Sequence, residues 1–164
     1  MSAPPKTAQL KTPSQSLTGL RLQKHADYQR AYAASRKRQS ASMSWFLAPQ
    51  SPAYAGALLP AGPRVGLTAG KVMGKAHERN RIKRRMREAL RRHTALFPRG
   101  FDMILHPRRS VLTVDFMKLE AEIVRILQQA NAEAARMAQS FASSVAVQGP
   151  TARQAPPAPP QVVP

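Results

Sequence analysis

The sequence predicts an α+β sandwich in which helices pack against a mostly antiparallel or mixed sheet. Short apolar segments with strand-like alternation are bounded by proline and glycine, and they are separated by segments whose apolar residues recur at helical spacing. The expected order along the chain is helix, strands, helix, strand, helix. Aromatic residues make up only 5% of the 164 residues, so one domain with a small core is expected.

The first helix is expected near Lys24–Ser35. Tyr28 and Tyr32 are four residues apart in this segment, which puts both rings on one helical face. The first clear strand follows at Met43–Ala48, and Pro49 ends it. In this strand the residues Met43, Trp45 and Leu47 alternate with Ser44, Phe46 and Ala48.

The next segments are two further strands and a cationic loop. A weaker edge strand is expected at Tyr54–Leu59, inside a stretch rich in proline and glycine, and a clearer one at Arg64–Ala69. The loop that follows is bracketed by two glycines and carries Lys71 and Lys75, which makes it a candidate phosphate site.

Two longer helices enclose the last strand. One helix is expected near Ala76–Leu96, followed by a strand at Phe101–Leu105. The last helix is expected to begin at the N-cap Asp115 and to end near Ala135. Its apolar stripe comprises Phe116, Leu119, Ile123, Ile126, Leu127 and Ala130.

The two ends of the chain differ in composition from its middle. Residues 1–19 are predicted to be a disordered arm, residues 20–136 the folded domain, and residues 137–164 a disordered tail rich in proline and alanine.

Charge narrows the choice of partner. The chain has 26 lysine and arginine residues against 8 aspartate and glutamate residues, a formal net charge of +18. Such a self-repelling cation is expected to bind a polyanion, with nucleic acid the first candidate and an anionic membrane the second.

The absence of cysteine excludes disulfides, cysteine-ligated zinc and cysteine nucleophiles, and is compatible with the expected cytoplasmic location. No apolar run is long enough for a transmembrane helix, and no secretory signal is expected.

The helix near Ala76–Leu96 concentrates the positive charge. At 100° per residue, its apolar sector contains Ile82, Met86, Ala89, Leu90 and His93, and its opposite side contains Asn80, Arg84, Arg87 and Arg91. Most charged side chains three or four residues apart in this helix have the same sign, and their repulsion weakens an isolated helix. Bound phosphate would replace this repulsion with attraction. A basic helix that is merely solvated remains the alternative. Asn80 favours RNA, because its amide can donate to phosphate and accept from a 2′-hydroxyl.

The segment Gly74-Lys75-Ala76-His77-Glu78-Arg79-Asn80-Arg81-Ile82-Lys83-Arg84-Arg85-Met86-Arg87-Glu88 resembles the signature of the bacterial ribonuclease P protein family. The two tyrosines of the first helix and the last strand and helix are similar to the same family. The resemblance implies a two-layer sandwich in the order α-β-β-β-α-β-α, with a mixed sheet and a left-handed crossover. This sequence departs from the family pattern in the loop, where Gly70-Lys71-Val72 has one cation fewer, and at His77, where an aliphatic residue is usual.

The same resemblance implies a function. The family's protein binds the ribonuclease P RNA and the 5′ leader of precursor tRNA, and the RNA hydrolyses the phosphodiester bond with Mg²⁺. The resemblance assigns contact with the catalytic RNA to Lys71, Lys75, Arg79, Asn80, Arg81, Lys83, Arg84 and Arg87. It assigns the leader cleft to Tyr28, Tyr32 and an aromatic residue of the first strand, Trp45 or Phe46. Core packing is an equal alternative for the two tyrosines.

No catalytic residue, cofactor or metal site is expected in the protein itself. Its four histidines lack metal-ligand spacing and its carboxylates are scattered, which disfavours a protein-only nuclease. The main alternative is a ribosomal protein or a general RNA chaperone. A DNA-binding basic region would need heptad repeats after the basic run, but Pro98 and Gly100 end the helix there. Membrane binding would need aromatic residues on the apolar face of the helix, and none precedes Phe97. Neither DNA nor a membrane is therefore an expected partner.

Overall fold

The computed structural model describes residues 17–51 and 62–147. Within them, the chain forms helix α1 (His25–Ala34), strands β1 (Arg38–Gln39), β2 (Met43–Pro49) and β3 (Arg64–Leu67), helix α3 (Ala76–Arg92), strand β4 (Phe101–Pro107) and helix α4 (Phe116–Val147). Short 3-10 turns are η1 (Leu17–Leu20), η2 (Lys71–Met73), η3 (Thr94–Leu96) and η4 (Arg109–Leu112). The predicted α+β class and the order of its elements are confirmed, and the expected strand at Tyr54–Leu59 lies outside the described residues.

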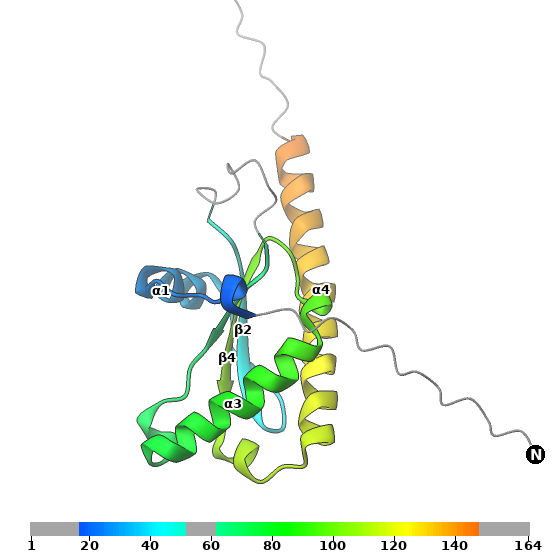
Figure 1. Cartoon of the computed structure of the whole chain (residues 1–164). Coiled ribbons are helices and arrows are strands. Elements are labelled where there is room, and N and C mark those ends of the chain that lie inside the picture. Colours follow the sequence, from blue (N-terminus) through cyan, green and yellow to red (C-terminus); the bar gives the residue numbers. More distant parts are fainter. Residues whose placement is uncertain (1–16, 52–61, 148–164) are drawn as a thin grey trace, which may run out of the picture.

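The strands form one mixed sheet in the order β1-β2-β4-β3 (Figure 1). Strand β2 is antiparallel to β1 and β4, and β3 is parallel to β4, so α3 is the crossover between the two parallel strands. The two-residue β1 was not expected from the sequence. Beyond β3, Arg21 forms a parallel bridge with Val65, and the Leu22 amide donates to the Val65 carbonyl at 2.9 Å.

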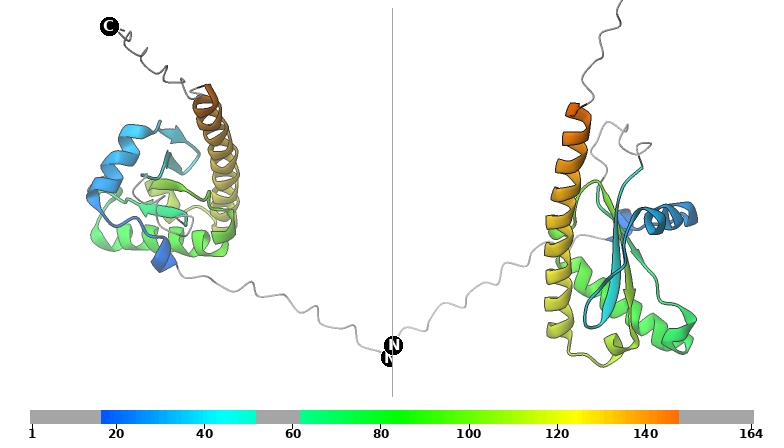
Figure 2. Two further views of the ribbon diagram at one scale, coloured as in Figure 1. Left: turned by 90° about the horizontal axis from the view of Figure 1, so that it is seen from above. Right: turned by 180° about the vertical axis from the view of Figure 1, so that it is seen from behind.

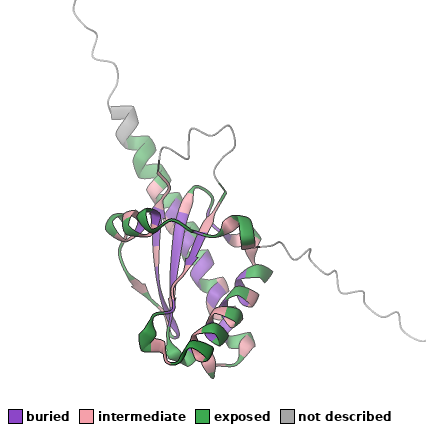
Figure 3. Cartoon of the chain, turned by 60° about the vertical axis from the view of Figure 1, so that its left-hand side comes forward, coloured by how far each residue is buried: buried purple, intermediate pink, exposed green. Residues whose placement is uncertain are grey.

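Helices cover both faces of the sheet. Figure 2 shows α1 on one side of the strands and α4 on the other, and Figure 3 shows the buried strands between them. The expected two-layer packing describes the sheet with α3 and α4, and α1 adds a short helix on the opposite face.

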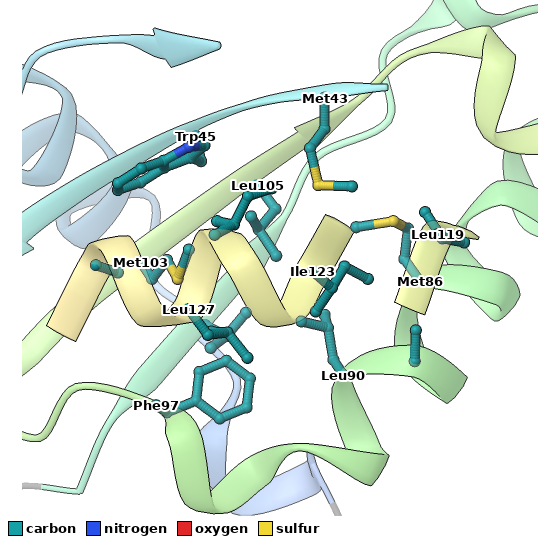
Figure 4. Close-up of a cluster of buried hydrophobic side chains, with 14 of the residues drawn as sticks. Met43, Trp45, Met86, Leu90, Phe97, Met103, Leu105, Leu119, Ile123 and Leu127 are labelled. Atoms are coloured by element: carbon teal, nitrogen blue, oxygen red, sulfur yellow. The ribbon is translucent and has the colours of Figure 1, made fainter. Parts of the chain in front are cut away.

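The alternation of β2 separates two apolar clusters. Met43, Trp45 and Leu47 join Met103 and Leu105 of β4 in the larger core, against buried residues of α3 and α4 (Figure 4). On the other face, Ala48 and Ile104 pack with Leu22 and Ala31, bordered by Tyr28, Tyr32 and Phe46. The strand-like alternation predicted for β2 is therefore confirmed.

Helix α3 buries the apolar face that its periodicity predicts. Ile82, Met86, Ala89 and Leu90 are buried, whereas His93 is only half-buried. The helix ends at Arg92, four residues before the expected end at Leu96, because η3 takes over there. The predicted face is confirmed, and the predicted end is wrong.

Helix α4 begins as predicted and ends later. The Asp115 carboxylate caps it by accepting hydrogen bonds from the Met117 and Lys118 amides at 2.9 and 3.3 Å. The expected end near Ala135 is wrong, since the helix runs to Val147 and includes the part of the expected tail from 137 to 147. Alanine, methionine and glutamine favour helix, and no glycine or proline interrupts the segment before Gly149.

Four charged residues hold α1 onto the sheet. The fully buried Asp102 carboxylate accepts hydrogen bonds from Arg64 Nε and Nη2, both at 2.7 Å, and from Arg30 Nη2 at 2.5 Å. The Asp27 carboxylate accepts from the same two guanidinium groups at 3.0 Å each. Each buried carboxylate thus has cationic donors from two elements, which fixes the position of α1 over β3 and β4.

Candidate nucleic-acid interface

The outer face of α3 carries most of the residues predicted to contact RNA. The apolar residues of the helix face the core, so most of its polar side chains point outward. Lys71, Lys75, Asn80, Arg81, Arg84 and Arg87 are exposed, and Arg79 and Lys83 are half-buried. The structure therefore brings all eight predicted positions to one helix and the loop that precedes it.

The cations of α3 divide into paired and unpaired groups. Arg91 and Arg92 bind Glu88 at 2.7 and 3.2 Å, and these hydrogen bonds, that of Arg91 first, lower the Glu88 pKa. By contrast, Arg81, Arg84 and Arg87 make no ion pair with any carboxylate in the described part of the chain. The surface available to phosphate is thus centred on the first three turns of α3, and Arg91 contributes less than the periodicity suggested.

The loop before α3 has a fixed backbone. Gly74 has a φ of +118°, which only glycine adopts easily, and a side chain there would collide with the Glu78 carboxylate. That carboxylate accepts a hydrogen bond from the Lys75 amide at 2.7 Å and one from Arg109 at 2.9 Å. The backbone hydrogen bond from Lys75 is the larger cause of the lowered Glu78 pKa, and Arg109 adds to it. Lys75 is therefore held at the helix N-terminus.

Arg79 lies nearer the core than Asn80 and Arg81. Its side chain is half-buried, and its Nε atom is buried without a hydrogen-bond partner among the described residues. Arg79 thus belongs to the edge of the outer face of α3, and Asn80 and Arg81 to its exposed part.

Half-buried rings gather on the opposite face of the sheet, where α1 meets β2 and β4. The Tyr28 and Tyr32 ring centroids are 6.4 Å apart, and Tyr32 makes an edge contact with Phe46 at 5.0 Å. His106 completes the group, at 5.6 Å from Tyr32 and 5.4 Å from Phe46. We call Tyr28, Tyr32, Phe46 and His106 the aromatic cluster. Each ring is half-buried, so each has one part in the packing and another at the surface.

Trp45 does not belong to this cluster, and its assignment to the leader cleft is wrong. Its side chain is 1% exposed and lies in the larger core, with the Arg38 guanidinium 5.1 Å from the ring centroid. Met43, its neighbour on the same face, is fully buried. Successive strand residues point to opposite faces, so of the two aromatic residues Trp45 and Phe46 only Phe46 can face α1.

His106 was missed by the sequence reasoning. Its Nε2 atom and the Tyr32 hydroxyl share a hydrogen bond of 2.7 Å. Burial, and to a lesser extent nearby Lys37, lower the His106 pKa, so the imidazole is mostly neutral at pH 7. Its position two residues after Ile104 on the same strand could have placed it on this face.

Tyr28 is held by the backbone of two neighbouring segments. Its hydroxyl donates to the Leu22 carbonyl at 3.3 Å, and its ring covers Gly66 of β3 so closely that a Cβ atom there would lie 2.7 Å from the ring. Burial is the main cause of the raised Tyr28 pKa. The Tyr28 ring thus occupies the space that a side chain at position 66 would need.

The described residues contain neither a metal site nor a membrane-spanning helix. Across residues 17–51 and 62–147, no three histidine or carboxylate side chains are grouped closely enough to hold a metal ion. No helix in these segments is long and apolar enough to cross a membrane.

Comparisons with known proteins agree with this geometry. The family model for ribonuclease P matches residues 18–131. The ribonuclease P protein component of Chloroflexus aggregans is 33% identical over 111 residues, which are 67% of this chain and 76% of that protein. The component from Finegoldia magna is 34% identical over 70 residues, 43% of this chain, and the match spans only 62% of that relative's length.

Solved structures show the same fold. The Staphylococcus aureus RNase P protein aligns with a TM-score of 0.55 at 22% identity, covering 68% of this chain and 94% of that one. The Thermotoga maritima RNase P protein aligns with a TM-score of 0.55 at 24% identity, covering 66% and 96%. The family model spans most of the chain, and the Chloroflexus relative exceeds 30% identity, so the chain belongs to the ribonuclease P protein family.

Proposed function

We propose that this chain is the protein subunit of a ribonuclease P holoenzyme in the cytoplasm, an endoribonuclease that removes the 5′ leader from precursor tRNA. In this proposal α3 binds the catalytic RNA and the aromatic cluster binds the leader. The observation that carries it is the separation of an unpaired cationic face and a ring-lined surface onto opposite sides of one sheet.

The charge of α3 supports binding to a structured RNA. Arg81, Arg84 and Arg87 face outward without carboxylate partners among the described residues, and the like charges repel one another in the free protein. Phosphates bound by guanidinium groups would relieve this repulsion and release counterions.

The aromatic cluster supports binding to a single strand. Half-buried tyrosine and phenylalanine rings offer surfaces on which unpaired bases stack, with about 1–3 kcal/mol per base. Exposed Arg36 and Lys37 follow α1 and supply positive charge for the backbone of such a strand. His106, mostly neutral, can exchange a hydrogen bond with a base as well as with Tyr32.

Hydrolysis in this proposal is carried by the RNA and its Mg²⁺ ions. The donor set of the described residues does not fit a protein-held Mg²⁺, because no group of three carboxylates or histidines comes together. The residues of this chain would bind and orient the two RNAs and offset the repulsion between their phosphates.

Reconstitution tests the proposal. The purified protein is expected to stimulate cleavage of precursor tRNA by a bacterial ribonuclease P RNA at low Mg²⁺, and no stimulation over the RNA alone would refute it. Replacing Arg81 and Arg84 with alanine should weaken assembly with the RNA, whereas Arg91→Ala, which removes a cation already paired with Glu88, should weaken it less.

The two surfaces can be tested separately. Tyr32→Ala should reduce affinity for precursor tRNA that carries a leader and leave affinity for mature tRNA nearly unchanged. If the arginine variants and the tyrosine variant gave the same defect, the division of roles between the two faces would be wrong.

A further inference from the structure

An open groove of roughly 680 Å³ runs between the first turns of α3 and the segment that joins η4 to α4. Its α3 side presents His77, Arg81 and Arg85, and its other side presents Thr113 and Phe116. Arg81 is shared between this groove and the exposed face of α3, so the groove continues that face beyond the helix.

The acidic residues of the groove are already engaged. Glu78 accepts hydrogen bonds from the Lys75 amide and from Arg109. Asp115 caps α4 through two backbone amides. Arg81 pairs with neither of them, so the groove is expected to keep a positive potential.

The width of the groove is fixed by Arg85. Its guanidinium donates to the Leu112 carbonyl at 2.7 Å and to the Val114 carbonyl, which ties the far wall to α3. The half-buried Phe116 ring lies beside this wall, with the Arg92 guanidinium 4.9 Å from its centroid. A built concave surface thus offers a cation, a hydroxyl and part of an aromatic ring together.

We propose that this groove binds a short single-stranded segment of the catalytic RNA, so that the RNA-binding surface extends from α3 to residues 113–116. The inference rests on the proposed function. Arg81 suits a phosphate, and Phe116 with Thr113 suits an unpaired base, which a duplex would keep inside its stack. The catalytic RNA is the occupant rather than the leader, because the groove adjoins α3 and the aromatic cluster lies across the sheet.

Cross-linking tests the inference directly, because the chain has no cysteine and a single introduced thiol can be labelled alone. In the holoenzyme, a photo-reactive group on Thr113→Cys should cross-link to unpaired nucleotides of the catalytic RNA. Met117→Cys is the matched control, since Met117 is 73% exposed and lies a few residues away without lining the groove. Val72→Cys, at a position 92% exposed in the loop before α3 and outside the eight predicted RNA contacts, reports assembly beside α3 without removing a charge.

A charge insertion gives a second readout. Thr113→Glu should weaken binding to the catalytic RNA at least about fivefold, and Met117→Glu less than about twofold, because like charge costs most where phosphate approaches closely. Thermal unfolding of both variants shows whether the fold is intact.

The outcomes separate the two proposals. If Val72→Cys cross-links but Thr113→Cys does so no better than Met117→Cys, the groove inference is overturned and the proposed function stands. Cross-links from Thr113→Cys to the leader would also overturn it. If no position cross-links and no complex assembles, the proposed function fails, and the groove inference with it.

Discussion

Replacing Gly66 with alanine should weaken leader binding by displacing Tyr28. The new Cβ atom would lie 2.7 Å from Tyr28 Cε1 and 2.8 Å from its hydroxyl oxygen, where ordinary contact begins at 3.4 Å. The ring must therefore move by about 0.7 Å, the difference between 3.4 and 2.7 Å. Overpacking of this kind costs about 1–3 kcal/mol. The ring is half-buried and can turn outward, so we expect about 1–2 kcal/mol in the free energy of unfolding.

Two measurements follow the displaced ring. Denaturant unfolding gives the stability change, and affinity for precursor tRNA with and without its leader gives the functional change. Loss of one stacked base corresponds to about 1–3 kcal/mol, so the leader-dependent affinity should fall about tenfold. Gly70→Ala is the matched control, because no heavy atom lies within 4 Å of its added Cβ and its φ of −72° suits alanine.

A double-mutant cycle decides whether the clash is the cause. In a Tyr28→Ala background the new methyl group has room, so Gly66→Ala should add little to either loss. If Gly66→Ala cost as much in that background, or if leader-dependent affinity were unchanged in the single variant, the assignment of Tyr28 to leader binding through its packing on Gly66 would be refuted.

Three further predictions concern charge. Asp102→Asn should destabilise the fold by about 3 kcal/mol and lower Tm by roughly 10 °C, because the two arginines that bond to the buried carboxylate lose their main partner; a shift near zero would contradict the anchoring role. Burial raises the Glu122 pKa, but hydrogen bonds from Ser40 and Ser42 outweigh burial and leave that pKa below 4.5. The ionised carboxylate should therefore stabilise the fold fully above pH 4.5, and this stabilisation should be lost as pH falls through the lowered pKa. Acid unfolding curves of Glu122→Gln should lack this pH dependence. Arg84→Ala should reduce the salt slope of RNA binding by about 0.7–0.9, and Arg91→Ala by less; equal reductions would show that pairing with Glu88 does not matter.

The spacing of apolar residues along the sequence predicted the elements and which of their side chains are buried together. The spacing of Ile82, Met86 and Leu90 identifies the buried face of α3, and the alternation of β2 identifies its two faces. Neither pattern says on which face a given helix packs. Trp45 was assigned to the cleft because it is aromatic, although it shares its face with Met43 and Leu47, and the larger core needed that face.

Contacts between distant segments were beyond the sequence pattern. Arg64 and Asp102 bond across 38 residues, and Arg30 reaches Asp102 across 72. Nothing in their local sequence distinguishes these residues from charged residues that lie at the surface. The groove beside Arg81 is also a tertiary feature, because its far wall is held in place by hydrogen bonds from Arg85 to backbone carbonyls that carry no sequence signal.

The two edges of the sheet affect how readily the free protein aggregates. Open strand edges can pair with other chains and start aggregation. At one edge β1 has only two residues and includes the charged Arg38, and at the other the backbone of Arg21 and Leu22 pairs with Val65 of β3. Among the residues that the structure describes, neither edge offers a long, flat template for intermolecular pairing. Aggregation of the free protein through strand pairing is therefore disfavoured at both described edges.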